Sequence, residues 1–222
     1  MGVAANLARI NEELAGKQVR LIAVTKKAEP SQMEEAFGLG VTEFGENRIQ
    51  DALAKREKLS PSLVQNAKWH FIGHLQTNKV KQAVGNFSLI HSVDSLKLAR
   101  EISRVASSRG MTQAILLQVK LAEDPDKSGF SRKEILSQFE EISKLPNLKV
   151  EGLMTITPLT DDPSITKQCF TGLSQLRSEL EAGHGVSLKE LSMGMTNDWQ
   201  EAVDCGATMI RLGRAIFYDS CA

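Results

Sequence analysis

The sequence lacks an excess of charge of either sign. Its 222 residues include 27 Lys and Arg and 27 Asp and Glu, so the formal net charge at pH 7 is zero. No run of five like charges forms a basic or an acidic tail. Because nucleic acids and acidic membrane surfaces attract proteins through clustered positive charge, we expect neither kind of partner.

Cysteine is scarce as well. The chain has three cysteines, Cys169, Cys205 and Cys221, with no Cys-x-x-Cys pair and no histidine at the spacing of a zinc finger. We interpret them as the reduced thiols of a cytoplasmic protein. Residues 1–17 carry two adjacent glutamates and no uninterrupted apolar core, so we predict neither a signal peptide nor a membrane anchor there.

The sequence does contain a regular alternation of short apolar stretches and amphipathic helical patterns. An opening helix is predicted by Val3, Leu7, Ile10 and Leu14, which recur at steps of four, three and four residues. Strands are expected near residues 19–27, 42–47, 69–74, 88–94, 114–119, 150–156, 189–195 and 208–213. Helical patterns separate them, and that near residues 164–182 is the longest.

Strands that alternate with helices in units of roughly 25 to 30 residues indicate right-handed parallel crossovers. Eight such units predict an α/β fold, a single (β/α)8 TIM barrel with an N-terminal helix. No linker interrupts the pattern, so we expect one domain over residues 1–222. An open, doubly wound parallel sheet is the competing architecture.

Lys26 lies where the first strand ends, on the same strand face as the apolar Ile22 and Val24. Active sites of such barrels lie at the carboxyl ends of the strands. We expect partial burial of the Lys26 amine on that rim, which favours the neutral form that condenses with an aldehyde into a Schiff base. An ordinary surface lysine is the alternative interpretation. Lys27 is expected to point to the opposite side, toward solvent.

Two glycine-containing segments near the end of the chain are typical of anion binding. Residues 192–198 place Gly194 at a strand end, ahead of hydroxyl and amide residues that suit a helix start. Residues 211–214 form a second glycine-containing turn after the last strand, and barrels commonly hold phosphate in these two loops. Plain capping and turn formation explain either segment alone. A lysine together with a phosphate site favours pyridoxal 5'-phosphate (PLP).

Other chemically active residues have simpler interpretations. His70 and His74 share a strand face, but no further ligand at a fixed spacing accompanies them, so we predict packing roles and no metal site. Glu46 and Asp94 are interpreted as groups at helix starts. The methionines near the strand ends, including Met195, are interpreted as core or pocket lining.

Six segments in order resemble the family of pyridoxal phosphate homeostasis proteins, which share the barrel of alanine racemase. The resemblance covers nearly the whole chain and rests on Ala23-Val24-Thr25-Lys26, Phe44-Gly45-Glu46-Asn47, residues 69–79, Gly152-Leu153-Met154-Thr155-Ile156, Leu191-Ser192-Met193-Gly194-Met195 and residues 210–217. It departs from the family pattern at Thr196, where serine is usual, at Lys120, where asparagine is usual, and at Tyr218, where glycine is usual. Thr196 keeps the hydroxyl, whereas the other two changes alter local loop contacts.

The resemblance implies a cofactor site and a role for most of its residues. Lys26 would hold PLP as a Schiff base and Arg211 would face the pyridine nitrogen. The remaining cofactor-binding residues would be Asn47 beside the ring, Ser192, Thr196, Gly213 and Arg214 around the phosphate, and Met195 in the same loop. A permanent cation at the pyridine nitrogen disfavours its protonation and so weakens the ring as an electron sink.

The function implied by the resemblance is PLP homeostasis and amino-acid balance without robust catalysis. Apo forms of PLP-dependent enzymes would be recipients, and a monomer is expected. A PLP-dependent amino-acid racemase or lyase is the alternative, but a racemase of this type needs a second base, and the only tyrosine is Tyr218. A Schiff-base aldolase that uses Lys26 on a phosphosugar, with no cofactor, is a further alternative.

Overall fold

The chain folds into a closed barrel of parallel strands. The computed structural model describes residues 2–122, 128–160 and 162–218. Each strand pairs with the next in sequence order, and β8 pairs with β1 to close the barrel. The strands are β1 (Arg20–Val24), β2 (Glu43–Glu46), β3 (Lys68–Phe71), β4 (Leu89–Val93), β5 (Gln113–Gln118), β6 (Leu148–Met154), β7 (Glu190–Ser192) and β8 (Met209–Leu212). This arrangement confirms the predicted barrel and excludes the open sheet.

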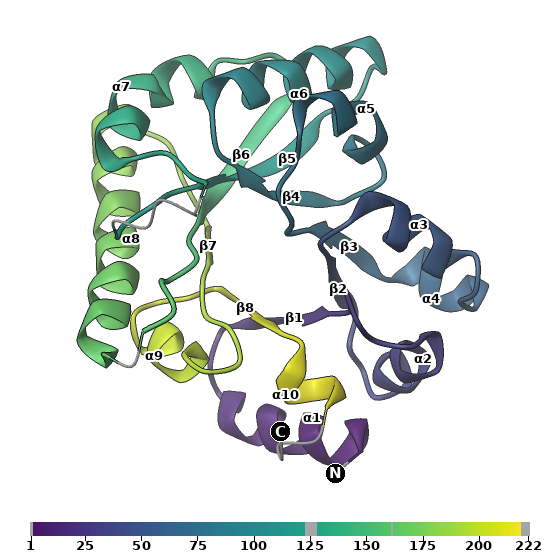
Figure 1. The fold of residues 1–222 in the computed structure, drawn as a ribbon. Coiled ribbons are helices and arrows are strands. Elements are labelled where there is room, and N and C mark those ends of the chain that lie inside the picture. The colour runs from purple at the N-terminus through teal and green to yellow at the C-terminus, as the bar shows by residue number, and fades with distance from the viewer. Residues whose placement is uncertain (1, 123–127, 161, 219–222) are drawn as a thin grey trace.

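Helices surround the strands on the outside (Figure 1). They are α1 (Val3–Leu14), α2 (Pro30–Gly38), α3 (Ile49–Arg56), α4 (Pro61–Asn66), the 3-10 helix η1 (Thr77–Lys79), α5 (Val80–Ala83), α6 (Leu96–Ser108), α7 (Arg132–Ser143), α8 (Pro163–His184), α9 (Trp199–Asp204) and α10 (Arg214–Phe217). The predicted opening helix is α1, and the amide of its buried Asn6 donates to the Ile216 carbonyl of α10 over 3.0 Å. This contact joins the two ends of the described chain (Figure 1).

Two of these helices were not predicted from the sequence. The Ser60–Pro61 pair begins α4: the Ser60 hydroxyl accepts a hydrogen bond from the Leu63 amide, and Pro61 occupies the first helical position. The expected turn after β8 continues as α10. Both helices are short, and neither spans enough residues to show an apolar periodicity.

The apolar core is divided unequally between the two faces of the sheet. A large cluster fills the space between the strands and the outer helices, whereas a small one lies inside the barrel, formed by Ile22, Leu89, Leu116, Met154 and Met209. Barrel interiors are usually filled by layers of branched apolar side chains. Here polar side chains, among them His70, His91, Ser192 and Arg211, take much of the interior.

Some sequence predictions fall outside the described structure. Cys221, and residues 123–127 between the fifth and sixth predicted strands, lie outside the described residues. Cys169 is buried and Cys205 is half-buried. Among the described residues, no helix combines the length and the apolarity needed to cross a bilayer.

Candidate functional site

The candidate residues come together on one side of the barrel mouth. They lie on, or directly after, four neighbouring strands in the order β7, β8, β1, β2. Parallel strands end at the same edge of a sheet, so residues far apart in the sequence are brought to one face. The set comprises Ser192, Met195 and Thr196 after or on β7, Arg211, Gly213 and Arg214 around β8, Lys26 after β1, and Asn47 after β2.

Lys26 is exposed, which corrects the expectation of a partly buried amine. The reason is that β1 ends at Val24, two residues before Lys26, so the side chain stands in the turn beyond the sheet. Ile22 is fully buried inside the barrel, as the predicted alternation requires. Lys27 is exposed as well, as predicted.

The backbone before Lys26 is held by a compact polar cluster. The Thr25 hydroxyl donates to Glu46 Oε1 over 2.6 Å, and its amide donates to the Gly45 carbonyl over 3.0 Å. The ammonium of Lys55, from α3, binds both the Thr25 carbonyl and Glu46 Oε1. Glu46 therefore fixes the end of β1, and it does not act as the helix-start group that the sequence suggested.

Arg211 is a buried cation inside the barrel. One guanidinium nitrogen, Nη1, donates to Ser192 Oγ over 2.7 Å, and Nη2 donates to the Thr155 carbonyl over 2.9 Å. Burial lowers the pKa of Arg211 to about 10, against a smaller opposing effect of the Asp198 carboxylate. Because this value is still well above neutrality, the guanidinium is protonated and remains a donor at physiological pH.

Ser192 is completely buried, and its hydroxyl contacts Arg211 and His91 Nδ1, the latter over 2.9 Å. This orientation corrects the expectation that its hydroxyl faces a phosphate group. Ser192 lies on an inward-facing position of β7, level with the guanidinium, so its side chain points into the barrel instead of toward the loops.

The loop between β7 and α9 is folded tightly by Asp198. Its Oδ1 accepts from the Met195 amide over 2.6 Å, and its Oδ2 accepts from the Thr157 hydroxyl over 2.7 Å. Gly194 has a φ of +91°, and a Cβ there would lie 2.6 Å from the Ala202 Cβ. Only glycine fits this turn. Met195 and Thr196 are half-buried at the mouth.

The turn after β8 approaches β1 closely. A Cβ on Gly213 would lie 3.0 Å from the Val24 carbonyl oxygen and 3.3 Å from the Val24 Cβ. Arg214, the first residue of α10, is exposed. Gly213 therefore lets the β8 turn lie directly against the strand that leads to Lys26.

Asn47 carries an enclosed polar atom without a partner. Its side-chain oxygen Oδ1 is buried and accepts no hydrogen bond from the residues that the structure describes. A buried acceptor left without a donor costs about 1–3 kcal/mol. The backbone of Asn47 is equally restricted, since a Cβ on Gly73 would lie 2.0 Å from its carbonyl oxygen.

The two histidines that share a strand pattern do not meet. His70 is buried in the barrel and contacts His91, with 2.9 Å between His70 Nδ1 and His91 Nε2. His74 is on the rim, 3.4 Å from the Asp94 carboxylate. Within residues 2–122, 128–160 and 162–218, no group of three or more His, Cys, Asp or Glu side chains could hold a metal ion.

Sequence reasoning missed the polar residues beneath the mouth. His91 lies in a strand that is otherwise mostly apolar, and Glu43 begins β2; both are buried. A signal was present, because polar residues recur at inward-facing positions of several strands. It became readable only once the register of the barrel showed which positions share the interior.

Comparisons with known proteins agree with this geometry. The family model of the alanine racemase N-terminal domain matches residues 2–221. A pyridoxal phosphate homeostasis protein from Synechocystis sp. is 45% identical over 201 residues, which cover 90% of this chain and 91% of the relative. A protein of the same name from Aquifex aeolicus is 39% identical over 198 residues, 89% of this chain and 86% of the relative.

Solved structures share the fold across the whole barrel. PipY from Synechococcus elongatus, determined with PLP bound, is 38% identical, with a TM-score of 0.90 over 97% of this chain and 99% of its own. An alanine racemase from Clostridium difficile, 16% identical with a TM-score of 0.80, covers 100% of this chain and 57% of its own, and shows the fold alone. The class is thus the barrel of the alanine racemase N-terminal domain. Within it, the chain belongs to the family of pyridoxal phosphate homeostasis proteins.

Proposed function

We propose that this protein binds PLP as a Schiff base on Lys26 and acts in intracellular PLP (vitamin B6) homeostasis and amino-acid balance, without robust catalysis. The observation that carries the proposal is the pairing of β1 with β8, in which Ile22 is the register partner of the buried Arg211. Lys26 follows Ile22 toward the mouth, so an amine and a fixed cation lie on neighbouring strands. The identity to PipY, 38% with PLP bound in that protein, supports the ligand.

Each candidate residue has a role that its surroundings fit. The Lys26 amine condenses with the aldehyde and releases water, and its exposure leaves it accessible to the ligand. Arg211 donates toward the pyridine nitrogen, and Asn47, directly after β2, lies beside the ring. Ser192 contributes by fixing Arg211.

The phosphate is assigned to the loops after β7 and β8. Thr196 supplies a hydroxyl, Gly213 an unobstructed backbone and Arg214 a cation, and Met195 lines the same loop. Loops after the seventh and eighth strands are common phosphate sites in this fold. The close approach of Gly213 to β1 supports the placement of phosphate and amine at one site.

A carrier role follows from the chemistry of Arg211. PLP supplies an electron sink to enzymes that protonate its ring nitrogen, and a fixed guanidinium disfavours that protonation. The protein would hold PLP for recipient apo-enzymes. We further propose that it is a cytoplasmic monomer and that residues 1–222 form one domain. The racemase alternative needs a second base, and the hydroxyl of Tyr218, the residue considered for that role, instead donates to the Lys27 carbonyl over 2.6 Å.

Replacement of Lys26 tests the proposal against a matched neighbour. Lys26→Ala should abolish the visible Schiff-base band formed on addition of PLP, whereas Lys27→Ala, which changes the adjacent exposed lysine, should keep it. Because both side chains are exposed, each variant should unfold within about 0.5 kcal/mol of the parent protein in urea. A band of full intensity in Lys26→Ala would contradict the assignment.

A further inference from the structure

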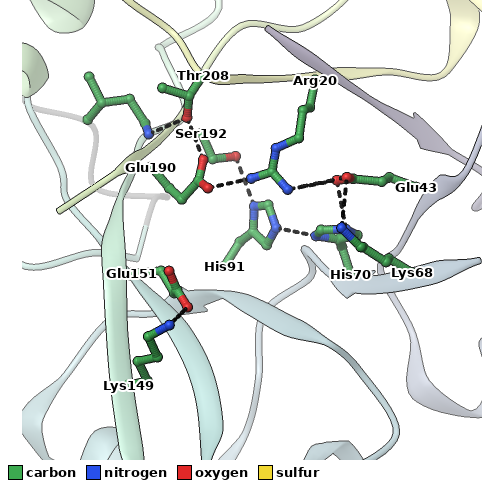
Figure 2. Close-up of polar contacts among 11 residues, drawn as sticks. Arg20, Glu43, Lys68, His70, His91, Lys149, Glu151, Glu190, Ser192 and Thr208 are labelled. Carbon is green, nitrogen blue, oxygen red and sulfur yellow. Dashed lines mark hydrogen bonds and ion pairs between the residues drawn. The ribbon is translucent and has the colours of Figure 1, made fainter. Parts of the chain in front are cut away.

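A series of four polar side chains, each in contact with the next, crosses the barrel interior below the proposed ligand site. Its members are Ser192, His91, His70 and Glu43, and we call it the polar file. Figure 2 shows His91 between Ser192 on one side and His70 on the other, with Glu43 beyond His70. The spacings are 2.9 Å for Ser192 Oγ to His91 Nδ1, 2.9 Å for His91 Nε2 to His70 Nδ1, and 3.2 Å for His70 Nε2 to Glu43 Oε2. Arg211 joins the file at Ser192.

The donor and the acceptor of each contact can be assigned by starting from the hydrogen bond between Arg211 and Ser192. A guanidinium only donates, so Ser192 Oγ accepts from Arg211. The remaining contact of the serine is to His91 Nδ1, and its single hydroxyl proton is available to that nitrogen. With a neutral imidazole, Nδ1 of His91 is then the acceptor and the ring proton lies on Nε2.

The contacts of His70 with His91 and Glu43 can be assigned in the same way. His91 Nε2 donates to His70 Nδ1, which places the ring proton of His70 on its own Nε2. That nitrogen lies against Glu43 Oε2 in a contact that is close but not well aligned as a hydrogen bond. A carboxylate only accepts, so every polar contact in the file runs from Arg211 toward Glu43.

Charged groups at the base of the barrel hold Glu43 ionised. Arg20 lies 3.2 Å and Lys68 lies 3.7 Å from its carboxylate, and Arg20 also pairs with Glu190 over 2.6 Å (Figure 2). Burial alone would raise the pKa of Glu43, but His70, Arg20 and Lys68 together hold it below its ordinary value. The end of the file is therefore a fixed acceptor.

His91 is held neutral by its surroundings. It is completely buried, and burial, followed by the positive fields of Arg211 and Arg20 and of His70 whenever that ring is protonated, lowers its pKa well below 6.5. A neutral His91 is what the hydrogen-bond directions require.

We propose that His91 and His70, oriented from Glu43, are positioning residues that fix the hydroxyl of Ser192 as an acceptor and thereby aim the Arg211 guanidinium at the bound PLP ring. This proposal deepens the proposed function and rests on it. The role lies in the orientation of Arg211, because neither histidine is among the residues at the mouth. As a consequence, the direction of the hydrogen bonds in the polar file controls the protonation of the PLP pyridine nitrogen and the affinity for PLP.

The ring protons of the ligand-free protein give the first test. Long-range ¹H–¹⁵N correlation spectra of histidine-labelled protein at pH 7 should show His91 and His70 both neutral and protonated on Nε2. Assignment uses His91→Asn and His70→Asn. Protonation of His91 on Nδ1, or on both nitrogens, would overturn the proposed direction of the file, whether or not the protein binds PLP.

Two amide substitutions separate the two sides of His91. In His91→Asn the amide oxygen takes the place of Nδ1 and can still accept from Ser192, whereas in His91→Gln the amide reaches toward His70 and the acceptor for Ser192 is lost. His91→Gln should weaken PLP binding about tenfold and shift the pH midpoint of the visible band, as loss of an outer-shell partner does in other sites. His91→Asn keeps the acceptor for Ser192 but loses the contact to His70, so it should weaken PLP binding less than His91→Gln does.

Ser192→Ala provides a second route if His91→Gln does not fold. It removes the shared link, so it should reproduce the shifted midpoint, and adding His91→Gln to it should change the midpoint no further. Equal midpoints and affinities in all variants would overturn the positioning role while the proposed function stands. Absence of the visible band in the parent protein would overturn both.

Discussion

Arg211 occupies a position that costs stability. An ionised side chain removed from water loses several kcal/mol of hydration in real proteins. Its hydrogen bonds to Ser192 and to the Thr155 carbonyl each return about 1.5–3 kcal/mol, because the donor is charged. The two bonds together return a free energy of the same order as this cost, so the buried cation adds little net stability. We propose that the cation is kept in the barrel for its contact with the ligand.

His91 makes stability depend on pH in a definite direction. Its folded pKa lies well below 6.5, so between those two values the unfolded chain binds a proton at this position and the folded chain does not. Stability should therefore fall as pH drops below about 6.5, by about 1.4 kcal/mol per pH unit for this one group. Urea unfolding of the parent protein and of His91→Asn from pH 7.5 to 5.5 measures the difference.

The comparison of the two proteins separates the effect of His91 from the effects of other ionisable groups. The remaining histidines are common to both proteins, and the lowered pKa of Glu43 affects stability only below its ordinary value of 4.5. Parallel stability curves for the two proteins would show that His91 is not a buried neutral group.

At the scale of elements, the turns after β2 and β3 depend on one close backbone contact. A Cβ on Gly73 would lie 2.0 Å from the Asn47 carbonyl oxygen, and backbone cannot move aside as a flexible side chain does. Gly73→Ala should cost about 3 kcal/mol or more of unfolding free energy and should disturb Asn47. Urea unfolding measures this cost.

Gly172→Ala is the matched control for that substitution. Gly172 lies within α8, where an added Cβ would be 3.7 Å from the nearest heavy atom, an ordinary contact. Alanine there should stabilise the helix by up to about 1 kcal/mol. Equal effects of the two substitutions would show that the close approach at Gly73 is not a packing constraint.

The sequence predicted the elements better than it predicted the interior. Eight strands and the long helix α8 were readable, because each carries a run or a periodicity of apolar residues. Lys26 and Arg211 were identified at strand ends, but the exposure of Lys26 and the inward hydroxyl of Ser192 were not. Both depend on where a strand stops and which way it faces, and these are set by pairing with neighbours distant in sequence.

At the scale of the whole molecule, barrel closure makes the site. The pairing of β8 with β1 joins residues from the two ends of the chain, so the strands that lead to Lys26 and carry Arg211 become neighbours only in the complete barrel. The polar file then links that mouth to ion pairs at the opposite end of the strands (Figure 2). Ligand binding should consequently be lost together with the fold, in one transition.

The central claim, a Schiff base between PLP and Lys26, is tested most directly by reduction and mapping. The protein is incubated with PLP, reduced with borohydride and digested, and the modified peptide is then identified by mass spectrometry. The visible band should disappear on reduction, and one pyridoxyl group should be found on Lys26. A pyridoxyl group on another lysine, or no adduct at all, would contradict it.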